Sequence, residues 1–191
     1  MAELFVEILG KPHGFIVFQL LAACRFTIYL SLIAFVGGGE VACLITLLRI
    51  SNAPSLQKCA TSFIWIFQSV PLLMLLFLIG LGMPRLLDVN VDPWTAATIS
   101  LVLFTAAYLA EVWRGAIESV ARGQWEASYA LNIRYSLLLR DIILPQAIKF
   151  GVAPTVGFMV QIIKGTSLAY IIGFNDLMLV GKRWANAPVL G

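Results

Sequence analysis

Long apolar runs dominate the sequence, and the first of them constrains the fold most. Residues 15–48 are almost entirely apolar or small, and this run exceeds the roughly 20 residues that a helix needs to cross a bilayer. Arg25 marks the expected near interface, so the first span is expected over residues 26–48. The chain is 60% hydrophobic and only 12% charged, whereas soluble domains average about 25% charged. The composition therefore indicates a membrane protein.

Three further apolar segments follow the first. Their expected boundaries are residues 61–82, 94–110 and 151–174. Pro71 interrupts the second of them. The sequence thus predicts a single all-α transmembrane domain over residues 1–191, a multi-span helical bundle in which four spans are visible and a polar loop over residues 111–150 separates the third from the fourth.

Charge concentrates in residues 111–147, which read as a helix, a turn and a second helix outside the apolar core. Three large side chains recur there at four-residue spacing, which places them on one helix face. They are Trp125, Tyr129 and Ile133. Asn132 stands where this helix can end, because asparagine tolerates the left-handed conformation. A second run over residues 135–143 is expected to stop at Leu144-Pro145, because proline restricts the residue before it.

Several short motifs in and around this segment resemble the EAA loop of permease subunits of ABC importers. The motifs are Glu126-Ala127, Leu131 with Ile133, and Ile143-Leu144-Pro145. The flanking motifs are similar to those of the polar amino-acid uptake branch in particular. They are Tyr108-Leu109-Ala110-Glu111, Arg114-Gly115, Gly123-Gln124-Trp125-Glu126-Ala127 and Leu144-Pro145-Gln146-Ala147. The likeness extends from about Thr27 to about Gly181, and it implies a permease-type helical bundle.

The resemblance implies a permease subunit of an ATP-driven importer for polar amino acids in the bacterial inner membrane. It also implies several partners: cytoplasmic ATP-binding subunits, an external solute-binding protein, a second permease subunit that is the same or related, a polar amino-acid substrate, and membrane lipid. The sequence contains no G-x-x-x-x-G-K-[ST] loop for holding ATP. ATP hydrolysis is therefore expected in a partner subunit, and this chain is not expected to be an enzyme.

The same resemblance implies which residues meet the ATP-binding subunit. They are Arg122, Gly123, Glu126, Ala127 and Asn132. Glu126 resembles the acid that docks the loop onto that subunit, and the alternative is a helix-surface carboxylate paired with Arg122. Glu118 and Arg122 are also spaced as a surface ion pair. Gly123 resembles the turn glycine of the family, whereas Asn132 departs from the family, which normally has glycine there.

A polar face on the fourth span is the candidate substrate pathway. Gly157, Gln161 and Lys164 stand at i, i+4 and i+7, and Ser167 follows at i+3 from the lysine. Lys164 lies about 20 Å of helix beyond Gly151, and a charge at that depth is costly unless a cavity is present. The family's usual Lys-Asp-Thr-Ser-Leu is Lys-Gly-Thr-Ser-Leu here. Lys164 therefore either attracts a substrate carboxylate or is a structural ammonium.

Glu40 is a second charge within an apolar run, in the first span. A charge inside the membrane is read as functional by default, so Glu40 joins Gln161, Lys164 and Ser167 as a candidate pathway residue. Against a functional role, members of the family often have apolar residues at this position.

Other function classes are disfavoured. The three cysteines lie far apart and there is a single histidine, so no metal site and no disulfide framework is expected. The net charge of +3 is too small to indicate nucleic-acid binding. No cofactor is expected.

Lys and Arg are more numerous in the loops after the first and third spans than on the opposite side. This favours a cytoplasmic loop over residues 111–150 and an external N-terminus. Members of the family usually carry one more span after the equivalent of Ala187. Its absence leaves a second interpretation open, in which the chain is a truncated membrane scaffold that assembles but does not transport.

Overall fold

The computed structural model describes residue 10 and residues 13–51 and 53–186, and throughout these residues every regular element is a helix. The chain divides into two compact units. The first comprises Met1–Val36, Pro71–Val102 and Gln161–Gly191, and the second comprises Gly37–Val70 and Leu103–Val160. The prediction of an all-α membrane fold is confirmed.

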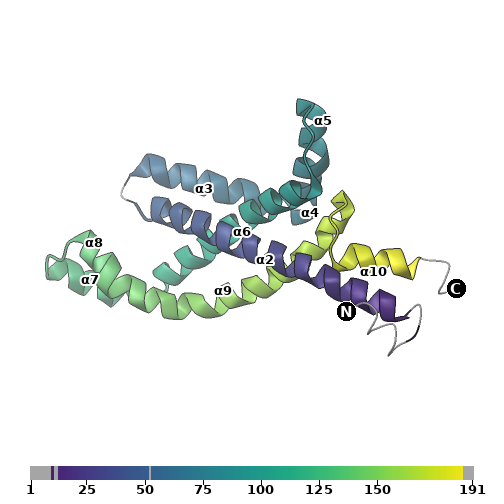
Figure 1. Cartoon of the computed structure of the whole chain (residues 1–191). Coiled ribbons are helices and arrows are strands. Elements are labelled where there is room, and N and C mark those ends of the chain that lie inside the picture. The colour runs from purple at the N-terminus through teal and green to yellow at the C-terminus, as the bar shows by residue number, and fades with distance from the viewer. Residues whose placement is uncertain (1–9, 11–12, 52, 187–191) are drawn as a thin grey trace. The chain divides into compact units, whose positions relative to one another are not determined.

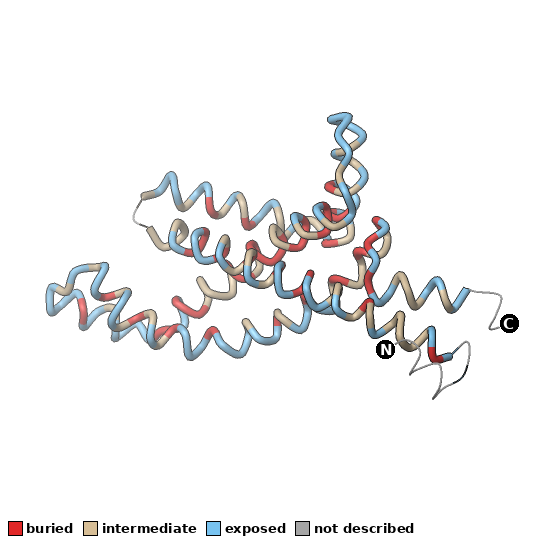
Figure 2. Tube along the Cα trace, in the orientation of Figure 1, coloured by how far each residue is buried: buried red, intermediate tan, exposed pale blue. Residues whose placement is uncertain are grey.

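Three helical stretches are long and apolar enough to cross a membrane (Figure 1). They are α2 (His13–Arg49), α6 (Pro93–Glu118) and the continuous stretch Tyr135–Ile172, whose main part is α9 (Leu144–Thr166). α6 is the most buried of the three (Figure 2).

A fourth candidate span is broken in the middle. α3 (Pro54–Ser69) and the helical stretch Leu72–Leu87 together pass the same test, but they bend by 96° at the break. Val70 is extended there, with φ −97° and ψ 122°, because the ring of Pro71 disfavours the helical conformation in the residue before it. The stretch after the break comprises α4 (Leu72–Phe77), the π-helix η1 (Leu78–Gly82) and α5 (Met83–Leu87).

Shorter helices connect and follow α6 and α9. They are α7 (Arg122–Ala130), α8 (Tyr135–Leu137), the π-helix η2 (Leu138–Ile143), the 3-10 helix η3 (Ser167–Ile172) and α10 (Leu177–Ala185). α6 extends eight residues beyond the predicted end at Ala110, so the polar loop is shorter than expected.

The expected stop at Leu144-Pro145 is wrong, because the helix continues through both residues. The backbone N–H of Leu144 bonds to the carbonyl of Leu139, five residues back. Proline lacks an N–H and clashes with the carbonyl four residues earlier in a regular α-helix. The wider π-turn before Pro145 accommodates this defect, and α9 then also runs through Pro154.

The first unit contains two close helix approaches at glycines. A Cβ on Gly165 would lie 2.9 Å from Cδ2 of Leu72, and one on Gly80 would lie 3.0 Å from Cγ2 of Ile172. In addition, the indole of Trp184 donates a 2.8 Å hydrogen bond to Oε1 of Gln19. These contacts join α4 to α9, η1 to η3 and α10 to α2.

The second unit is held by aromatic stacking and a few interhelical hydrogen bonds. Tyr108 stacks on Phe158 with ring centroids 5.4 Å apart, and Phe104 lies against both rings. The amide of Gln68 donates to the backbone carbonyl of Ala107 at 3.3 Å. The core of this unit therefore joins α3, α6 and α9.

Candidate functional site: the α7 segment and the polar face of α9

A buried apolar cluster in the second unit holds the α7 segment, residues 119–143, between α6 and α9. Its buried members come from the end of α6, the following turn, η2 and the start of α9. They are Ile117, Val120, Leu138, Ile143 and Ala147. Half-buried side chains pack against it, among them Trp125, Ile133 and Tyr135. The predicted helical face thus lies inward at Trp125 and Ile133, whereas Tyr129 is 60% exposed.

The turn after α7 forms as the sequence predicted. Asn132 adopts the left-handed conformation with φ 55°. The N–H of Ile133 bonds to the carbonyl of Ser128, and the N–H of Asn132 bonds to that of Tyr129, both at 3.0 Å. This is the Schellman arrangement, which satisfies the last carbonyls of the helix. Asparagine therefore performs the role of the family's glycine at this turn.

The residues expected to meet the ATP-binding subunit come together on α7 and its C-terminal turn. All five are exposed: Arg122, Gly123, Glu126, Ala127 and Asn132. Within the described residues Glu126 makes no ion pair and no hydrogen bond through its side chain, so the alternative pairing with Arg122 is not formed. Gly123 lies in the first turn of α7, where an added Cβ would meet nothing within 4 Å.

The expected pair of Glu118 and Arg122 is also wrong. α6 ends at Glu118 and α7 begins at Arg122, so the two residues do not share a helix. Glu118 instead pairs with Arg114, one turn earlier on α6, and Arg114 also binds Glu111, with Nε 3.0 Å from Oε2. The spacing of Glu111, Arg114 and Glu118 on one helix face was the sequence signal for this network.

A hydrogen bond that the sequence did not predict ties α8 to the end of α2. The hydroxyl of Tyr135 donates to the backbone carbonyl of Ile50 at 2.8 Å. Tyr135 is the residue that opens α8 after the turn. The α7 segment is therefore attached both to the helices that flank it and to α2.

The candidate pathway residues on α9 lie on an unpartnered face of the helix. Gly157, Gln161 and Lys164 are exposed, and α9 is continuous through all three. Ser167, in η3, donates its hydroxyl to the backbone carbonyl of Lys164. No ion pair engages the Lys164 ammonium in the part of the chain that is described. Glu40, on α2, is likewise exposed.

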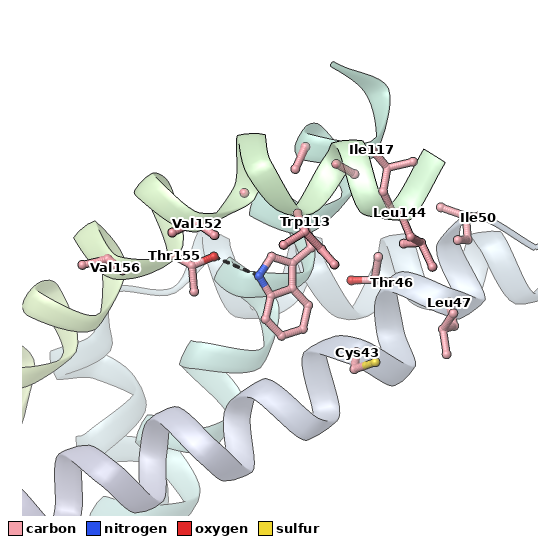
Figure 3. Close-up of a pocket in the computed structure, with 14 residues that line it drawn as sticks. Cys43, Thr46, Leu47, Ile50, Trp113, Ile117, Leu144, Val152, Thr155 and Val156 are labelled. Carbon is pink, nitrogen blue, oxygen red and sulfur yellow. Dashed lines mark hydrogen bonds between the residues drawn. The ribbon is translucent and has the colours of Figure 1, made fainter. Parts of the chain in front are cut away.

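An apolar pocket of about 510 Å³ lies in the second unit among α2, α6 and α9 (Figure 3). The indole Nε1 of Trp113, on α6, donates a 3.0 Å hydrogen bond to Oγ1 of Thr155, on α9, at its wall. The sequence gave no indication of this pocket, because it depends on which faces of three separate helices meet.

These features define a multi-pass helical membrane protein. Its exposed helix α7 lies between α6 and α9 and packs against the buried cluster. Residues 41–190 match the family described as binding-protein-dependent transport system inner membrane component. The chain belongs to this family, in its amino-acid ABC transporter permease branch.

Named relatives agree with this assignment. The chain is 35% identical over 157 residues to the probable amino-acid ABC transporter permease protein YckA of Bacillus subtilis, covering 82% of this chain and 69% of that protein. It is 34% identical to the L-cystine transport system permease protein TcyB of the same organism, over 87% of this chain and 68% of that protein.

Solved structures agree as well. A crystal structure of an amino acid ABC transporter with histidines aligns with a TM-score of 0.83 at 27% identity, over 88% of this chain and 78% of that one. The MetNI methionine ABC transporter in an inward-facing conformation shares the fold, with a TM-score of 0.67 at 22% identity over 94% of this chain and 86% of that one.

Proposed function

We propose that the chain is the membrane-spanning subunit of an ATP-driven importer for polar amino acids in the bacterial inner membrane. In this role it couples ATP hydrolysis by a partner subunit to movement of the substrate. One observation carries the proposal: Glu126 presents an unpaired carboxylate on an exposed helix whose other face is packed into a buried cluster. The amino-acid permeases among its relatives support the substrate class.

The contacts that hold the α7 segment suit it to transmit force to the long helices. Trp125 and Ile133 pack into the cluster that also contains residues of α6 and α9, and Tyr135 bonds to the end of α2. A cytoplasmic ATP-binding subunit that grips Glu126 and Ala127 would therefore move the ends of three long helices together. Close-packed protein interiors have low compressibility and transmit displacement.

The assembly that this role requires contains cytoplasmic ATP-binding subunits, an external solute-binding protein and a second permease subunit, the same or related. It also requires the α7 segment to face the cytoplasm. In a variant whose native cysteines are replaced, cysteine at Asp88 should react with a membrane-impermeant thiol reagent in intact cells, whereas cysteine at Ser136 should not. Both positions are exposed. Labelling of the Ser136 position from outside would reverse the orientation.

Charge reversal at Glu126 tests the coupling role. Glu126→Lys should still insert into the membrane, since α7 is exposed and the cluster beneath it is unchanged. Removing one partner of a buried charged contact costs about 2–5 kcal/mol, so co-purification with the ATP-binding subunits should fall by tenfold or more. Asp141→Lys is the matched control, because Asp141 is an exposed carboxylate of the same segment, 3.6 Å from Arg140.

The readout is substrate-stimulated ATP hydrolysis in liposomes that contain the full assembly. Loss of stimulation in Glu126→Lys, with stimulation retained in Asp141→Lys, is the expected result. If the assembly containing the unaltered chain binds the ATP-binding subunits but substrate never stimulates hydrolysis, the chain is a scaffold. Normal stimulation in Glu126→Lys would remove Glu126 from the coupling surface.

The proposed pathway for the substrate runs along the polar face of α9, with Gln161, Lys164 and Ser167 as contacts and Glu40 as a further polar position. Its support is that Gln161 and Lys164 are exposed on a helix long enough to cross the membrane. A polar face left uncovered at that depth favours a water-filled path or a partner subunit over lipid.

A further inference from the structure

The pocket among α2, α6 and α9 contains none of the candidate residues of α7 or of the polar face of α9. Its walls are apolar except for the hydroxyls of Thr46 and Thr155, and both oxygens are already hydrogen-bonded. Thr46 donates to the carbonyl of Ala42 at 2.8 Å, and Thr155 accepts from Trp113 at 3.0 Å. The pocket therefore offers an occupant almost only apolar contact (Figure 3).

The pocket is elongated along helices that can span the membrane. Its lining on α9 runs from Leu144 to Val156, which corresponds to about 18 Å of helix. All three helices that line it are long and apolar enough to cross a membrane. An open apolar groove in such helices is surrounded by lipid, so the acyl chain of a lipid is the molecule available to fill it.

Two cationic side chains flank the pocket lining in the sequence, and neither is neutralised by an ion pair within the described residues. Arg49 lies between Leu47 and Ile50 of the wall, and Lys149 follows Ile148. The Nε of Arg49 is buried without a hydrogen-bond partner. Glu111 binds Arg114 through both carboxylate oxygens; it acts on Arg49 electrostatically but forms no ion pair with it.

We propose that this pocket binds an anionic phospholipid, with one acyl chain along the apolar wall and the phosphate held by Arg49 and Lys149. Basic pockets between transmembrane helices bind anionic headgroups in this way. A zwitterionic lipid of the same chain length satisfies the wall equally well but gains less from the two cations. The headgroup therefore decides which lipid binds more tightly, because the apolar wall contacts the acyl chains of both lipids equally well.

Fluorescence quenching by brominated lipids tests the site, because Trp113 lines it. The full chain is reconstituted in vesicles of phosphatidylcholine that contain a few per cent of either dibrominated phosphatidylglycerol or dibrominated phosphatidylcholine. The expected result is at least twofold stronger quenching by the glycerol lipid, and Trp113→Phe should remove this excess. Equal quenching by the two lipids, or an excess that survives Trp113→Phe, would overturn the proposal.

A filling variant tests occupancy without altering Trp113. Val152 lines the pocket and is 54% exposed, whereas Val160 lies outside it on the same helix and is 48% exposed. Val152→Phe should lower retention of phosphatidylglycerol in native mass spectrometry at least fivefold, and Val160→Phe should not. Lys149→Gln, at an exposed position, should lower retention of phosphatidylglycerol but not of phosphatidylcholine.

The same measurement identifies the competing occupant. If Val152→Phe changes the oligomeric state of the purified chain while phosphatidylglycerol retention stays the same, the groove is a contact with a second copy and the proposal is overturned. Should Val152→Phe fail to fold, Lys149→Gln and the quenching comparison still decide, because they leave the apolar wall at Val152 unaltered.

Discussion

The hydroxyl of Tyr135 donates a 2.8 Å hydrogen bond to the backbone carbonyl of Ile50, 85 residues earlier in the chain. The carbonyls that follow the last turn of a helix lack an intrahelical partner, and Tyr135 satisfies one of them just beyond the end of α2. This bond joins the segment that carries Glu126 to a helix that is not its neighbour in sequence. It attaches the end of α2 to the segment that carries α7.

Removing that hydroxyl should loosen the segment without unfolding the chain. Tyr135→Phe keeps the ring in the buried cluster and loses one hydrogen bond, which contributes about 0.5–1.5 kcal/mol. Amide hydrogen exchange over residues 119–143 should accelerate, and substrate-stimulated ATP hydrolysis should fall. Tyr129→Phe is the control, because the Tyr129 ring is 60% exposed. Identical exchange in both variants would contradict a role for the bond.

The approach of α9 to α4 predicts an unequal response to alanine at two glycines of one helix. Glycine to alanine in a helix is ordinarily favourable by about 0.5–1 kcal/mol. Gly157→Ala should show this gain, since an added Cβ there meets nothing within 4 Å. Gly165→Ala should instead lower the unfolding temperature, because its Cβ would lie 2.9 Å from Leu72. Equal shifts in the two variants would show that α4 yields freely.

The same contact predicts how the chain responds to the residue that is usual in the family at this position. Aspartate is usual at the position of Gly165, and a carboxylate there would need the space that the buried Leu72 side chain occupies. Gly165→Asp should therefore destabilise the chain more than Gly165→Ala does. Thermal unfolding of Gly165→Asp with Leu72→Ala would check this, and the second substitution should restore part of the lost stability.

Asp176 predicts a pH dependence of stability. Its side chain is 1% exposed, it caps α10 through Oδ1 and the N–H of Leu179 at 2.8 Å, and its Oδ2 has no hydrogen-bond partner. Burial raises the pKa of the Asp176 carboxyl above its ordinary value. The protonated form is then the one that the fold favours.

Because the pKa of Asp176 is higher in the folded state than in the unfolded state, its contribution to stability falls as the pH rises. The contribution of Asp176 to stability is fully present below the unfolded pKa of about 3.9 and is lost as the pH rises through the folded pKa. Asp176→Asn keeps the capping oxygen but does not titrate. The unfolding temperature of Asp176→Asn minus that of the natural chain should therefore increase as the pH rises. Parallel profiles for the two proteins would contradict the assignment. Asp176→Ala loses the cap, which contributes about 1 kcal/mol, so it should be less stable than Asp176→Asn by about that amount at every pH.

Local features of the fold were predictable from the sequence wherever a single residue type decides the backbone. The left-handed turn at Asn132 and the break at Pro71 both follow from the conformational limits of one residue. Pro145 shows where that reasoning fails. Its effect depends on a π-turn formed by the preceding residues, which no propensity of the proline itself could indicate.

Contacts between helices were not predictable in the same way. The charges of Glu111, Arg114 and Glu118 were visible, but their pairing depended on α6 continuing past Ala110. The Trp113–Thr155 hydrogen bond joins residues 42 positions apart, and it requires the rotation of two helices about their axes to be known. Periodicity gives the faces of each helix, but packing decides which faces meet.

Lys164 is the residue whose chemistry bears most directly on the proposed substrate pathway. It is exposed on α9, and within the described residues its ammonium has no carboxylate partner. A charge-assisted hydrogen bond to a substrate carboxylate is worth about 1.5–3 kcal/mol, which is about tenfold or more in affinity.

Lys164→Met keeps the length of the side chain and removes its charge. Uptake of radiolabelled amino acid by the reconstituted assembly should weaken by that factor, while assembly with the ATP-binding subunits is retained. Lys58→Met, which removes an exposed charge from α3, should leave uptake unchanged. If uptake and substrate preference in Lys164→Met equal those of the natural chain, the ammonium is structural and the substrate passes along another face.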